Sequence, residues 1–232
     1  MEIIAEIGQN HNGDMALARE LIVAAKQAGA SVAKFQLYDA RALFPHEGNE
    51  WFAYNCKTEL SHADIEMLAS ECASIGIEFM SSVFDAERVG WLEGVGMRRY
   101  KIASRSVRDR ALIEAVAATG KPMIVSLGMW NGTGFPRIKS KGRVEFLYCV
   151  SKYPTPLSDL HLGQVDFGRY AGFSDHTIGI DAAIAALARG ARIIEKHFTL
   201  DKSMYGPDHA GSMTPDELAA ICRFRDSLAQ AI

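Results

Sequence analysis

Several features are missing from this sequence, and each absence excludes a class of protein. No run of basic residues occurs, and the net charge is −3 with both signs dispersed along the chain, so a nucleic-acid partner is not expected. The four cysteines form no C-x-x-C pair, which argues against a zinc ribbon and a disulfide framework. No apolar stretch is long enough to span a bilayer, and no leader-like segment precedes the first strand-like run, so we expect a cytoplasmic protein without membrane contact.

The sequence does contain an alternation of strand-like and helix-like segments. Apolar, β-rich runs occur at 2–7, 32–37, 77–81, 98–103, 122–127, 144–150, 170–173 and 192–198. Helical periodicity is found at 14–28, 61–75, 85–92, 109–119, 179–189 and 214–230. These alternating units predict an α/β fold, the closed (β/α)8 TIM barrel, as a single domain over residues 1–232. A doubly wound open sheet is the alternative, but no G-x-G-x-x-G motif follows the first run.

Two connections lack a helical pattern. Residues 128–143 are rich in glycine and basic residues and contain a proline, and residues 154–169 leave room for no more than a short helical turn. We therefore expect the helices after strands five and six to be short or missing. Their absence predicts bare apolar surface on the barrel wall, which we expect another subunit to cover in a homo-oligomer.

Polar residues cluster at the carboxyl ends of the expected strands, where TIM-barrel active sites form. In chain order they are Glu6, Lys34, Gln36, Ser81, Ser82, Lys101, Ser104, Ser126, Ser151, Tyr153, Ser174, Asp175, His176, Glu195, Lys196 and His197, with Ser174 to His176 in the loop after strand seven. Three of them, Lys34, Lys101 and Lys196, interrupt otherwise apolar strands. Either alternation sends one or two of these lysines outward, or they converge with the hydroxyls on an anion such as phosphate.

Two histidines at neighbouring strand ends, His176 and His197, are candidate metal ligands. Each has a carboxylate beside it in the sequence, Asp175 and Glu195, of the kind that orients metal-binding imidazoles. Imidazole with oxygen ligands suits Mn²⁺, Fe²⁺, Zn²⁺ or Co²⁺. The alternative is that both histidines are structural.

A series of short motifs, in this order, resembles the N-acetylneuraminate (sialic acid) synthase family over almost the whole chain. They are Glu6-Ile7-Gly8-Gln9-Asn10-His11-Asn12-Gly13, Lys34-Phe35-Gln36, Tyr100-Lys101-Ile102-Ala103-Ser104, Tyr153-Pro154-Thr155-Pro156, Ser174-Asp175-His176-Thr177, Glu195-Lys196-His197-Phe198-Thr199 and Gly206-Pro207-Asp208-His209. The resemblance implies a transferase that condenses phosphoenolpyruvate with the open-chain aldehyde of an N-acyl hexosamine. The products are a 3-deoxy-2-keto sugar acid of the nonulosonate type and phosphate.

The resemblance also implies roles for particular residues. It makes His176 and His197 ligands of a divalent metal, Mn²⁺ first, with Mg²⁺, Co²⁺, Fe²⁺ and Zn²⁺ as alternatives. The phosphoenolpyruvate-binding set is Lys34, Ser82, Lys101, Ser104, Ser126, Ser151 and Ser174. The sugar-side set is Glu6, Gln36, Tyr153 and Asp208. Glu6 would also activate or orient the water that attacks C2 of phosphoenolpyruvate.

The sequence departs from the family pattern at two further points. The chain ends at Ile232, after the last expected helix, so we expect no C-terminal antifreeze-like domain. Ser106, preceded by Arg105, stands where the family has a carboxylate. We therefore hypothesise a sugar acceptor other than N-acetylmannosamine. Two competing interpretations stay open: a class I aldolase with Lys101 or Lys196 as the Schiff-base lysine, and a non-catalytic pseudoenzyme of the same fold.

Overall fold

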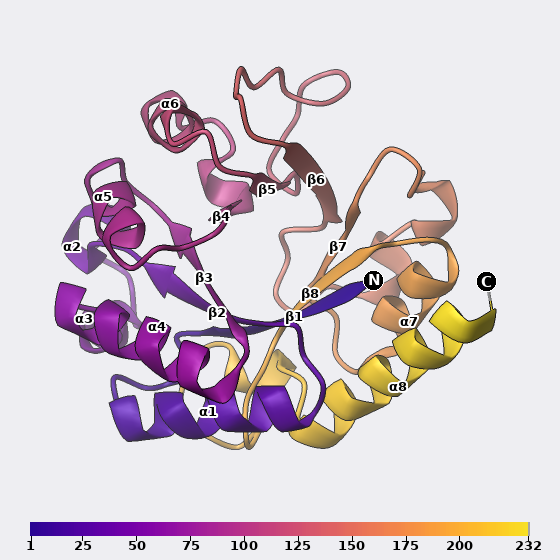
Figure 1. Cartoon of the computed structure of the whole chain (residues 1–232), viewed down its shortest axis with the longest axis horizontal. Helices are drawn as coiled ribbons and strands as arrows, with labels where there is room; N and C mark the ends of the chain where they lie inside the picture. Colours follow the sequence, from indigo (N-terminus) through magenta and orange to yellow (C-terminus); the bar gives the residue numbers. More distant parts are fainter. Residues whose placement is uncertain (232) are drawn as a thin grey trace.

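Eight parallel strands form a closed barrel in sequence order (Figure 1). The computed structural model describes residues 1–231 of the chain. The strands are β1 (Glu2–Gly8), β2 (Val32–Leu37), β3 (Glu78–Val83), β4 (Tyr100–Ile102), β5 (Met123–Ser126), β6 (Val144–Cys149), β7 (Gly172–Asp175) and β8 (Ile193–His197). Because β8 pairs with β1, the sheet has no free edge. The TIM-barrel fold expected from the sequence is confirmed.

Helices cover most of the outside of the barrel. They are α1 (Met15–Gln27), α2 (Ala40–Leu43), α3 (Phe52–Lys57), α4 (His62–Ile75), α5 (Glu87–Gly94), α6 (Arg110–Ala118), α7 (Asp181–Ala188) and α8 (Pro215–Ala231). Side-chain caps set several of the starts; for example, Asp14 accepts from the first N–H groups of α1, and Ser61 forms a capping box with Asp64 at α4. Helices α2 and α3 were not expected, because they are too short to show helical periodicity.

The barrel interior has an apolar layer and a polar layer, which follow from the alternation of side chains along each strand. The apolar layer consists of Ile4, Val32, Met80, Ile124, Leu147, Ala171 and Ile193. Two residues further along most of these strands the inward position is polar, and these positions include Glu6, Lys34, Ser82, Ser126 and Glu195. The apolar layer therefore closes the barrel below the polar one, which lies at the carboxyl ends of the strands.

The connections after β5 and β6 lack α-helices, as the sequence predicts. Residues 127–143 form an irregular loop at the top of Figure 1, and the connection after β6 contains two short 3-10 turns, Leu157–Asp159 and Leu162–Gln164. The ring of Phe135 in the loop lies 4.7 Å from Phe146 of β6 and 4.8 Å from Tyr170. The expectation of a bare barrel wall is therefore wrong in part, because the loop itself covers apolar side chains of β6.

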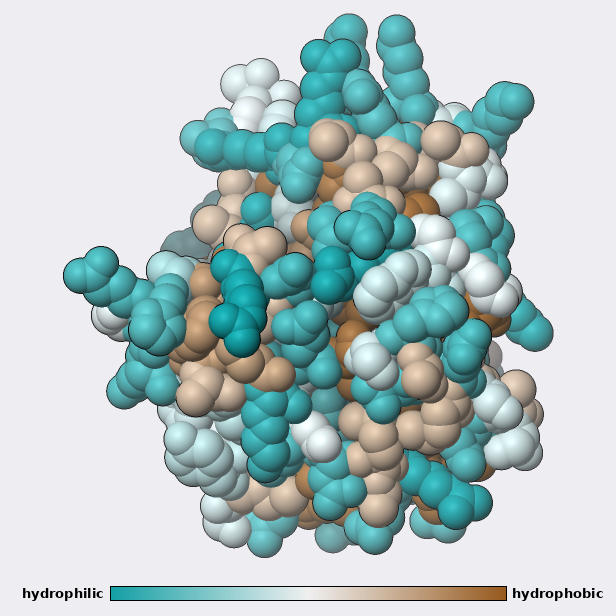
Figure 2. Space-filling view, turned by 90° about the vertical axis from the view of Figure 1, so that its left-hand side faces the viewer, coloured by the Kyte–Doolittle hydropathy of each residue, from teal (hydrophilic) through white to brown (hydrophobic). Residues whose placement is uncertain are grey.

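The molecular surface mixes hydrophilic and hydrophobic residues. On the face shown in Figure 2 the two kinds are interspersed, and long hydrophilic side chains project at the top. Within residues 1–231, none of the helices combines the length and the apolar character that a transmembrane span requires.

Two strands lie further along the chain than expected. β3 includes Ser82, and β7 includes Ser174 and Asp175, which the sequence placed in the following loop. The reason is pairing: Ser174 lies opposite Cys149 of β6 and Glu195 of β8, and these neighbours extend the ladder past the apolar run. The correction matters for the site, because it places the Ser174 hydroxyl on a rigid strand.

Candidate active site

A small pocket of about 60 Å³ opens at the carboxyl ends of the strands. Eleven of the site residues predicted from the sequence line it: Glu6, Lys34, Gln36, Ser82, Lys101, Ser104, Ser126, Tyr153, Ser174, His176 and His197. The other two, Ser151 and Asp208, line a wider cleft of about 590 Å³ that shares Gln36, Ser104, Tyr153 and His197 with the pocket. The fold thus brings together side chains from all eight strands or the turns that follow them.

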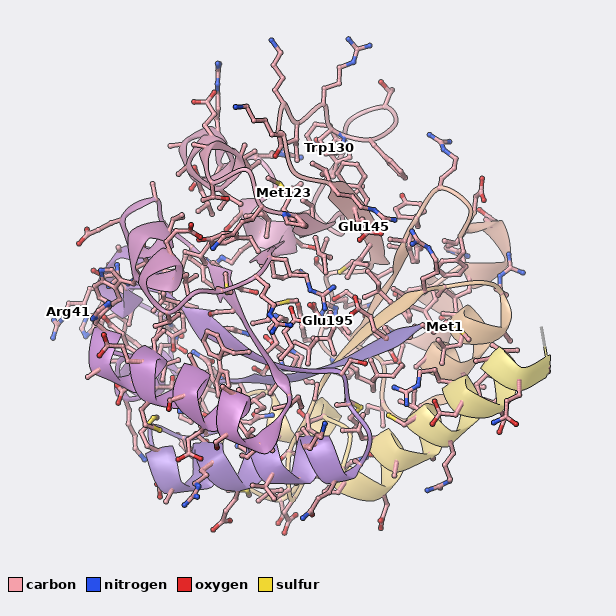
Figure 3. The ribbon with its side chains drawn as sticks, viewed as in Figure 1. Met1, Arg41, Met123, Trp130, Glu145 and Glu195 are labelled. Carbon is pink, nitrogen blue, oxygen red and sulfur yellow. The ribbon has the colours of Figure 1, made fainter. Side chains whose placement is uncertain are left out.

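Four charged side chains, Glu6, Lys34, Lys101 and Glu195, form the floor of the pocket. Lys34 Nζ lies 2.7 Å from Glu6 Oε2 and 3.6 Å from Glu195 Oε2. Lys101 Nζ lies 3.5 Å from Glu195 Oε1. Glu195 is labelled near the centre of the barrel in Figure 3, and its two carboxylate oxygens contact the two lysines. All four are buried, so each ammonium group depends on these carboxylates in place of water.

Hydrogen bonds between the charged groups and neutral side chains complete the floor. Lys34 donates to Ser82 Oγ at 2.9 Å, and Gln36 Nε2 donates to Glu6 Oε1 at 2.8 Å. Ser174 Oγ donates to Glu195 Oε1 at 3.0 Å. Among residues 1–231, the buried hydroxyl of Ser126 has no hydrogen-bond partner. A buried donor without a partner costs free energy unless a ligand accepts from it, so Ser126 is available to a bound anion.

The floor shifts the pKa values of its members in opposite directions. Burial raises the pKa of Glu195, but Lys101 and Lys34 outweigh burial and lower it to about 2. For Lys34, burial lowers the pKa, and the attraction of Glu195 and Glu6 outweighs burial and raises it. For Lys101, burial and the neighbouring Lys34 prevail over Glu195 and lower the pKa. Lys101 is therefore the floor cation that gains most from an added anion.

Lys196 does not belong to the floor. Alternation places it on the opposite side of β8 from Glu195, where its Nζ lies 3.0 Å from Asp175 Oδ2 and donates to the carbonyl of Thr177. Of the two interpretations of the three strand lysines, convergence therefore holds for Lys34 and Lys101. Lys196 is also buried and lines the pocket, but its ammonium group is held by Asp175 and does not join the other two lysines.

The mouth of the pocket is formed by Tyr153, His176, His197 and Asp208. The ring centroids of His176 and His197 are 6.1 Å apart, and Tyr153 Oη lies 3.1 Å from His176 Nε2. His197 Nδ1 lies 3.9 Å from Asp208 Oδ2. The mouth therefore presents two imidazoles, a phenol and a carboxylate above the floor.

The carboxylates that orient these histidines are not the ones expected from the sequence. Asp175 and Glu195 pair with lysines instead. His176 Nδ1 lies 3.0 Å from the carbonyl oxygen of Val150, and the carboxylate nearest to His197 is Asp208. Asp175 is adjacent to His176, and adjacent residues on a strand point to opposite faces. Glu195 lies on the same face of β8 as His197, but its carboxylate pairs with Lys34 and Lys101 across the barrel.

A divalent metal, which the family resemblance implies, fits the mouth. His197 Nδ1 is buried and has no hydrogen-bond partner among the described residues. Within residues 1–231, no group of three His, Cys, Asp or Glu side chains is arranged to hold a metal ion. The chain therefore offers His176 and His197 as ligands, and substrate or solvent oxygens would have to complete the coordination.

Three residues that line the pocket were not predicted from the sequence: Phe84, Ala103 and Cys149. Cys149 Sγ accepts from Ser104 Oγ at 3.3 Å and lies 3.8 Å from His176 Nδ1. Strand alternation could have found it, because Leu147 points inward and Cys149 is two residues further along β6. Nothing in the sequence alone distinguishes Phe84 or Ala103 from ordinary core residues.

The fold and this polar pocket define a TIM-barrel enzyme, and comparisons with known proteins specify the class further. The NeuB family model matches residues 21–232. An N,N'-diacetyllegionaminic acid synthase from Legionella pneumophila is 36% identical over 93% of this chain and 68% of its own length. The human N-acetylneuraminate-9-phosphate synthase is 32% identical over 95% of this chain and 68% of its own length.

A solved structure agrees with these relatives. The N-acetylneuraminic acid (sialic acid) synthetase from Leptospira borgpetersenii, crystallised with citrate, superposes with a TM-score of 0.89 at 31% identity, covering 99% of this chain and 84% of that one. The chain belongs to the NeuB family, and the two relatives named above are sugar-acid synthases. The family resemblance and the enzyme class expected from the sequence are confirmed.

Proposed function

We propose that the chain condenses phosphoenolpyruvate with an aldose, an N-acyl hexosamine or a related sugar, to give a nonulosonate-type 3-deoxy-2-keto sugar acid and phosphate. The floor carries this proposal. Two buried lysines, Lys34 and Lys101, face one small pocket together with serine hydroxyls, one of which, Ser126, has no partner among residues 1–231. Ammonium groups and hydroxyls are the donors that phosphate and carboxylate groups accept from.

In this assignment phosphoenolpyruvate lies on the floor, with its phosphate and carboxylate bound by the two lysines and the hydroxyls of Ser82, Ser104, Ser126, Ser151 and Ser174. The floor lysines are already held by Glu6 and Glu195 before substrate arrives, so they need little reorganisation when it binds. The sugar lies above, at the mouth, in contact with Gln36, Tyr153 and Asp208.

The bond-forming step joins C3 of phosphoenolpyruvate to the aldehyde carbon of the sugar. Positive character develops at C2, water adds there, and the resulting tetrahedral adduct expels phosphate. In this proposal Glu6 acts on this water; the hydrogen bond of its Oε1 with Gln36 and the ion pair of its Oε2 with Lys34 support the role, because they fix the carboxylate. Glu6 and Glu195 also stabilise the positive charge at C2, while the pocket walls fix the two reacting carbons near each other.

His176 and His197 would hold the divalent metal, for which Mn²⁺ is the first choice. When bound, such an ion supplies Lewis-acid polarisation of the aldehyde oxygen. The Val150 carbonyl oxygen, 3.0 Å from His176 Nδ1, orients that ring, so its Nε2 would hold the ion in place of the Tyr153 hydroxyl. On His197 the unpartnered Nδ1 would be the ligand, with Asp208 Oδ2 3.9 Å away.

The test is consumption of phosphoenolpyruvate and release of phosphate by metal-reconstituted protein with a panel of aldoses and N-acyl hexosamines. We expect release that requires one class of sugar and divalent metal. It should also be lost on Lys101→Met and on His197→Ala. Turnover that proceeds equally well after chelation and dialysis would contradict the metal assignment, and normal turnover of N-acetylmannosamine would overturn the hypothesis of a different acceptor.

A class I aldolase remains as a second candidate, because the pKa of Lys101 is lowered by burial and by Lys34. Lys196 is a poor Schiff-base lysine, since Asp175 and a backbone carbonyl hold its ammonium group. Borohydride trapping with a carbonyl substrate, followed by mass spectrometry, would identify a Schiff base at Lys101. Phosphoenolpyruvate binding without consumption in the presence of any sugar would favour the pseudoenzyme.

We also propose that the chain is cytoplasmic, that residues 1–232 act as one domain, and that the chain forms a homo-oligomer. Val144, Phe146 and Tyr148 of β6 are only half-buried despite the loop that covers them, which leaves apolar area for a second copy. Light scattering on the purified chain gives the oligomeric state directly.

A further inference from the structure

The connection after β8 carries Asp208, which the proposed function places beside the sugar. This loop, residues 199–212, is closed at its base, where Thr199 N donates to the carbonyl of Met213 at 3.0 Å. Most of the loop has no regular structure, and Asp208 directly precedes its short 3-10 turn, His209–Gly211. The position of the Asp208 carboxylate therefore depends on the side chains that hold the loop along its length.

Two asparagines of the connection between β1 and α1 hold this loop on both sides of the Asp208 side chain. Asn10 Nδ2 donates to Ser212 Oγ at 2.9 Å, and Ser212 Oγ donates in turn to the backbone carbonyl of Asp208 at 2.7 Å. Asn12 Oδ1 lies 3.1 Å from His209 Nε2. The reaction proposed above involves neither asparagine, so their contacts point to a role in holding the loop.

His209 is the centre of the second attachment. Its side chain is buried, and both of its ring nitrogens have partners. Because an amide oxygen can only accept, Nε2 donates to Asn12 Oδ1, and in the neutral ring Nδ1 accepts from Thr199 Oγ1 at 2.7 Å. Asn12 Oδ1 also accepts from Tyr54 Oη at 2.6 Å, which joins α3 to the same attachment. The imidazole thus connects the start of the loop, the neighbourhood of Asp208 and the β1–α1 connection.

The loop passes close to this attachment at Gly206. Its φ of +153° lies in the region that favours glycine. A Cβ at this position would lie 2.6 Å from Tyr54 Oη and 2.8 Å from His209 Cδ2, closer than non-bonded heavy atoms approach. A side chain at position 206 would therefore displace the loop from the tyrosine and the histidine. The glycine permits this contact two residues before Asp208.

We propose that His209 is a positioning residue, which fixes the Asp208 carboxylate in the wider cleft by tying the loop to Asn12. This inference rests on the proposed function, in which Asp208 contacts the sugar, and adds the residues that keep this contact in place. Gln9 of the β1–α1 connection and Asp208 both line the cleft of about 590 Å³, so the attachment joins two segments that line it. A carboxylate that is fixed before the acceptor binds loses less conformational entropy on binding.

The test measures initial rates of phosphoenolpyruvate consumption while the concentration of each substrate is varied in turn. His209→Phe keeps a buried ring but removes both nitrogens, so we expect KM for the acceptor to rise about 10-fold while KM for phosphoenolpyruvate stays within about twofold. His209→Gln should restore much of this loss, because its amide nitrogen is as many bonds from the backbone as Nε2. Asn12→Gly, which suits the φ of +54° at this position, and Gly206→Ala should each raise KM for the acceptor as well.

A double variant separates positioning from general packing. In Asp208→Ala the carboxylate is already absent, so adding His209→Phe should change KM for the acceptor by less than about twofold. Effects of the two changes that multiply would show that His209 does not act through Asp208, and would overturn the proposal.

His11→Phe is the matched control, because His11 is another buried histidine of the β1–α1 connection. Within residues 1–231 its side chain has no hydrogen bond to the loop. It should leave KM for the acceptor unchanged. A rise as large as that of His209→Phe would show that any loss of packing in this region weakens acceptor binding, and would overturn the specific role of His209.

Failure of the proposed function would give a different result. If no sugar supports turnover, the proposed function fails, and amide hydrogen exchange of peptides that cover residues 199–212 still decides on the attachment. Faster exchange in His209→Phe that is confined to this loop supports His209 as the residue that holds it. Exchange that is unchanged, or that accelerates throughout the barrel, overturns the proposal.

Discussion

The floor and the mouth of the pocket lie one above the other, but they differ in whether their polar groups have partners within the protein. Every charged group of the floor already has a counter-charge in the protein, with Glu6 and Glu195 on Lys34 and Lys101. At the mouth, His197 Nδ1 is buried without a hydrogen-bond partner in the described chain. The difference teaches that the floor is built by folding, whereas the mouth is completed by what binds to it.

The largest effect is expected from removing the carboxylate at the centre of the floor. Glu195→Gln leaves Lys34 and Lys101 without their shared partner, so we expect the free energy of unfolding to fall by about 3–5 kcal/mol. We also expect kcat/KM to fall by about 10²–10³-fold, because the two lysines lose their fixed positions. Denaturant unfolding and initial rates measure both effects.

Glu114→Gln is the control for this change, since Glu114 pairs with Arg110 on the exposed face of α6. Its cost should stay below about 1 kcal/mol. An equal loss in the free energy of unfolding for the two variants would show that the ion pairs of the floor are not formed in solution. The proposed difference between floor and mouth would then be wrong.

Truncating the mouth should separate activity from stability. His197→Ala removes a ring whose Nδ1 has no partner in the described part of the chain, so we expect the free energy of unfolding to change by less than about 1 kcal/mol. Activity should nevertheless fall by about 10²-fold or more if His197 holds the metal. His62→Ala on α4, which is largely exposed, should affect neither quantity. A stability loss as large as that of Glu195→Gln would assign His197 to the folded framework instead.

Acid should weaken the floor only at low pH, because the carboxylate of Glu195 resists protonation. The pKa of Glu195 is lowered from 4.5 to about 2, so its pairing stabilises the fold fully above about pH 4.5 and is lost as the pH falls toward about 2. Stability measured across this window should fall less steeply in Glu195→Gln than in the unaltered chain. Parallel curves would show that Glu195 titrates alike in the folded and unfolded states.

The smallest effect is expected at the outer edge of the mouth. Tyr153 is 61% exposed, and its hydroxyl lies 3.1 Å from His176 Nε2. Tyr153→Phe removes one neutral hydrogen bond, so we expect activity to fall by about two- to tenfold with unchanged unfolding. A loss as large as that of His197→Ala would indicate that the hydroxyl contacts the reacting groups themselves.

Much of this protein could be predicted from local patterns in the sequence. The apolar runs and the helical stripes indicate a (β/α)8 barrel, because strands covered on both faces and amphipathic helices leave different periodicities. The absence of a stripe in residues 128–143 and 154–169 likewise predicts connections without α-helices, which the structure confirms. Because barrel sites lie at the carboxyl ends of strands, residues such as Lys34 and Ser126 are predicted to belong to one site. Both line the pocket.

Other features required the tertiary structure, because they depend on which strands become neighbours. Sequence proximity suggested that Asp175 and Glu195 serve the histidines, but Asp175 pairs with Lys196 of β8, and Glu195 pairs with Lys34 of β2 and Lys101 of β4, which the closed barrel brings to it. Phe135 of the loop after β5 packs on Phe146 and Tyr170, on a part of the barrel wall that the sequence predicts to be bare. The sequence does not reveal this contact, because loop packing leaves no periodicity.

The sequence by itself determined the barrel, its missing helices and the set of polar residues at one end, because each of these depends on residues close together in the chain. Only the tertiary structure decided that Lys34 and Lys101 share Glu195 while Lys196 pairs with Asp175. The physical reason is that closing the barrel sets distances between strands that are far apart in sequence, and electrostatic interactions depend on those distances.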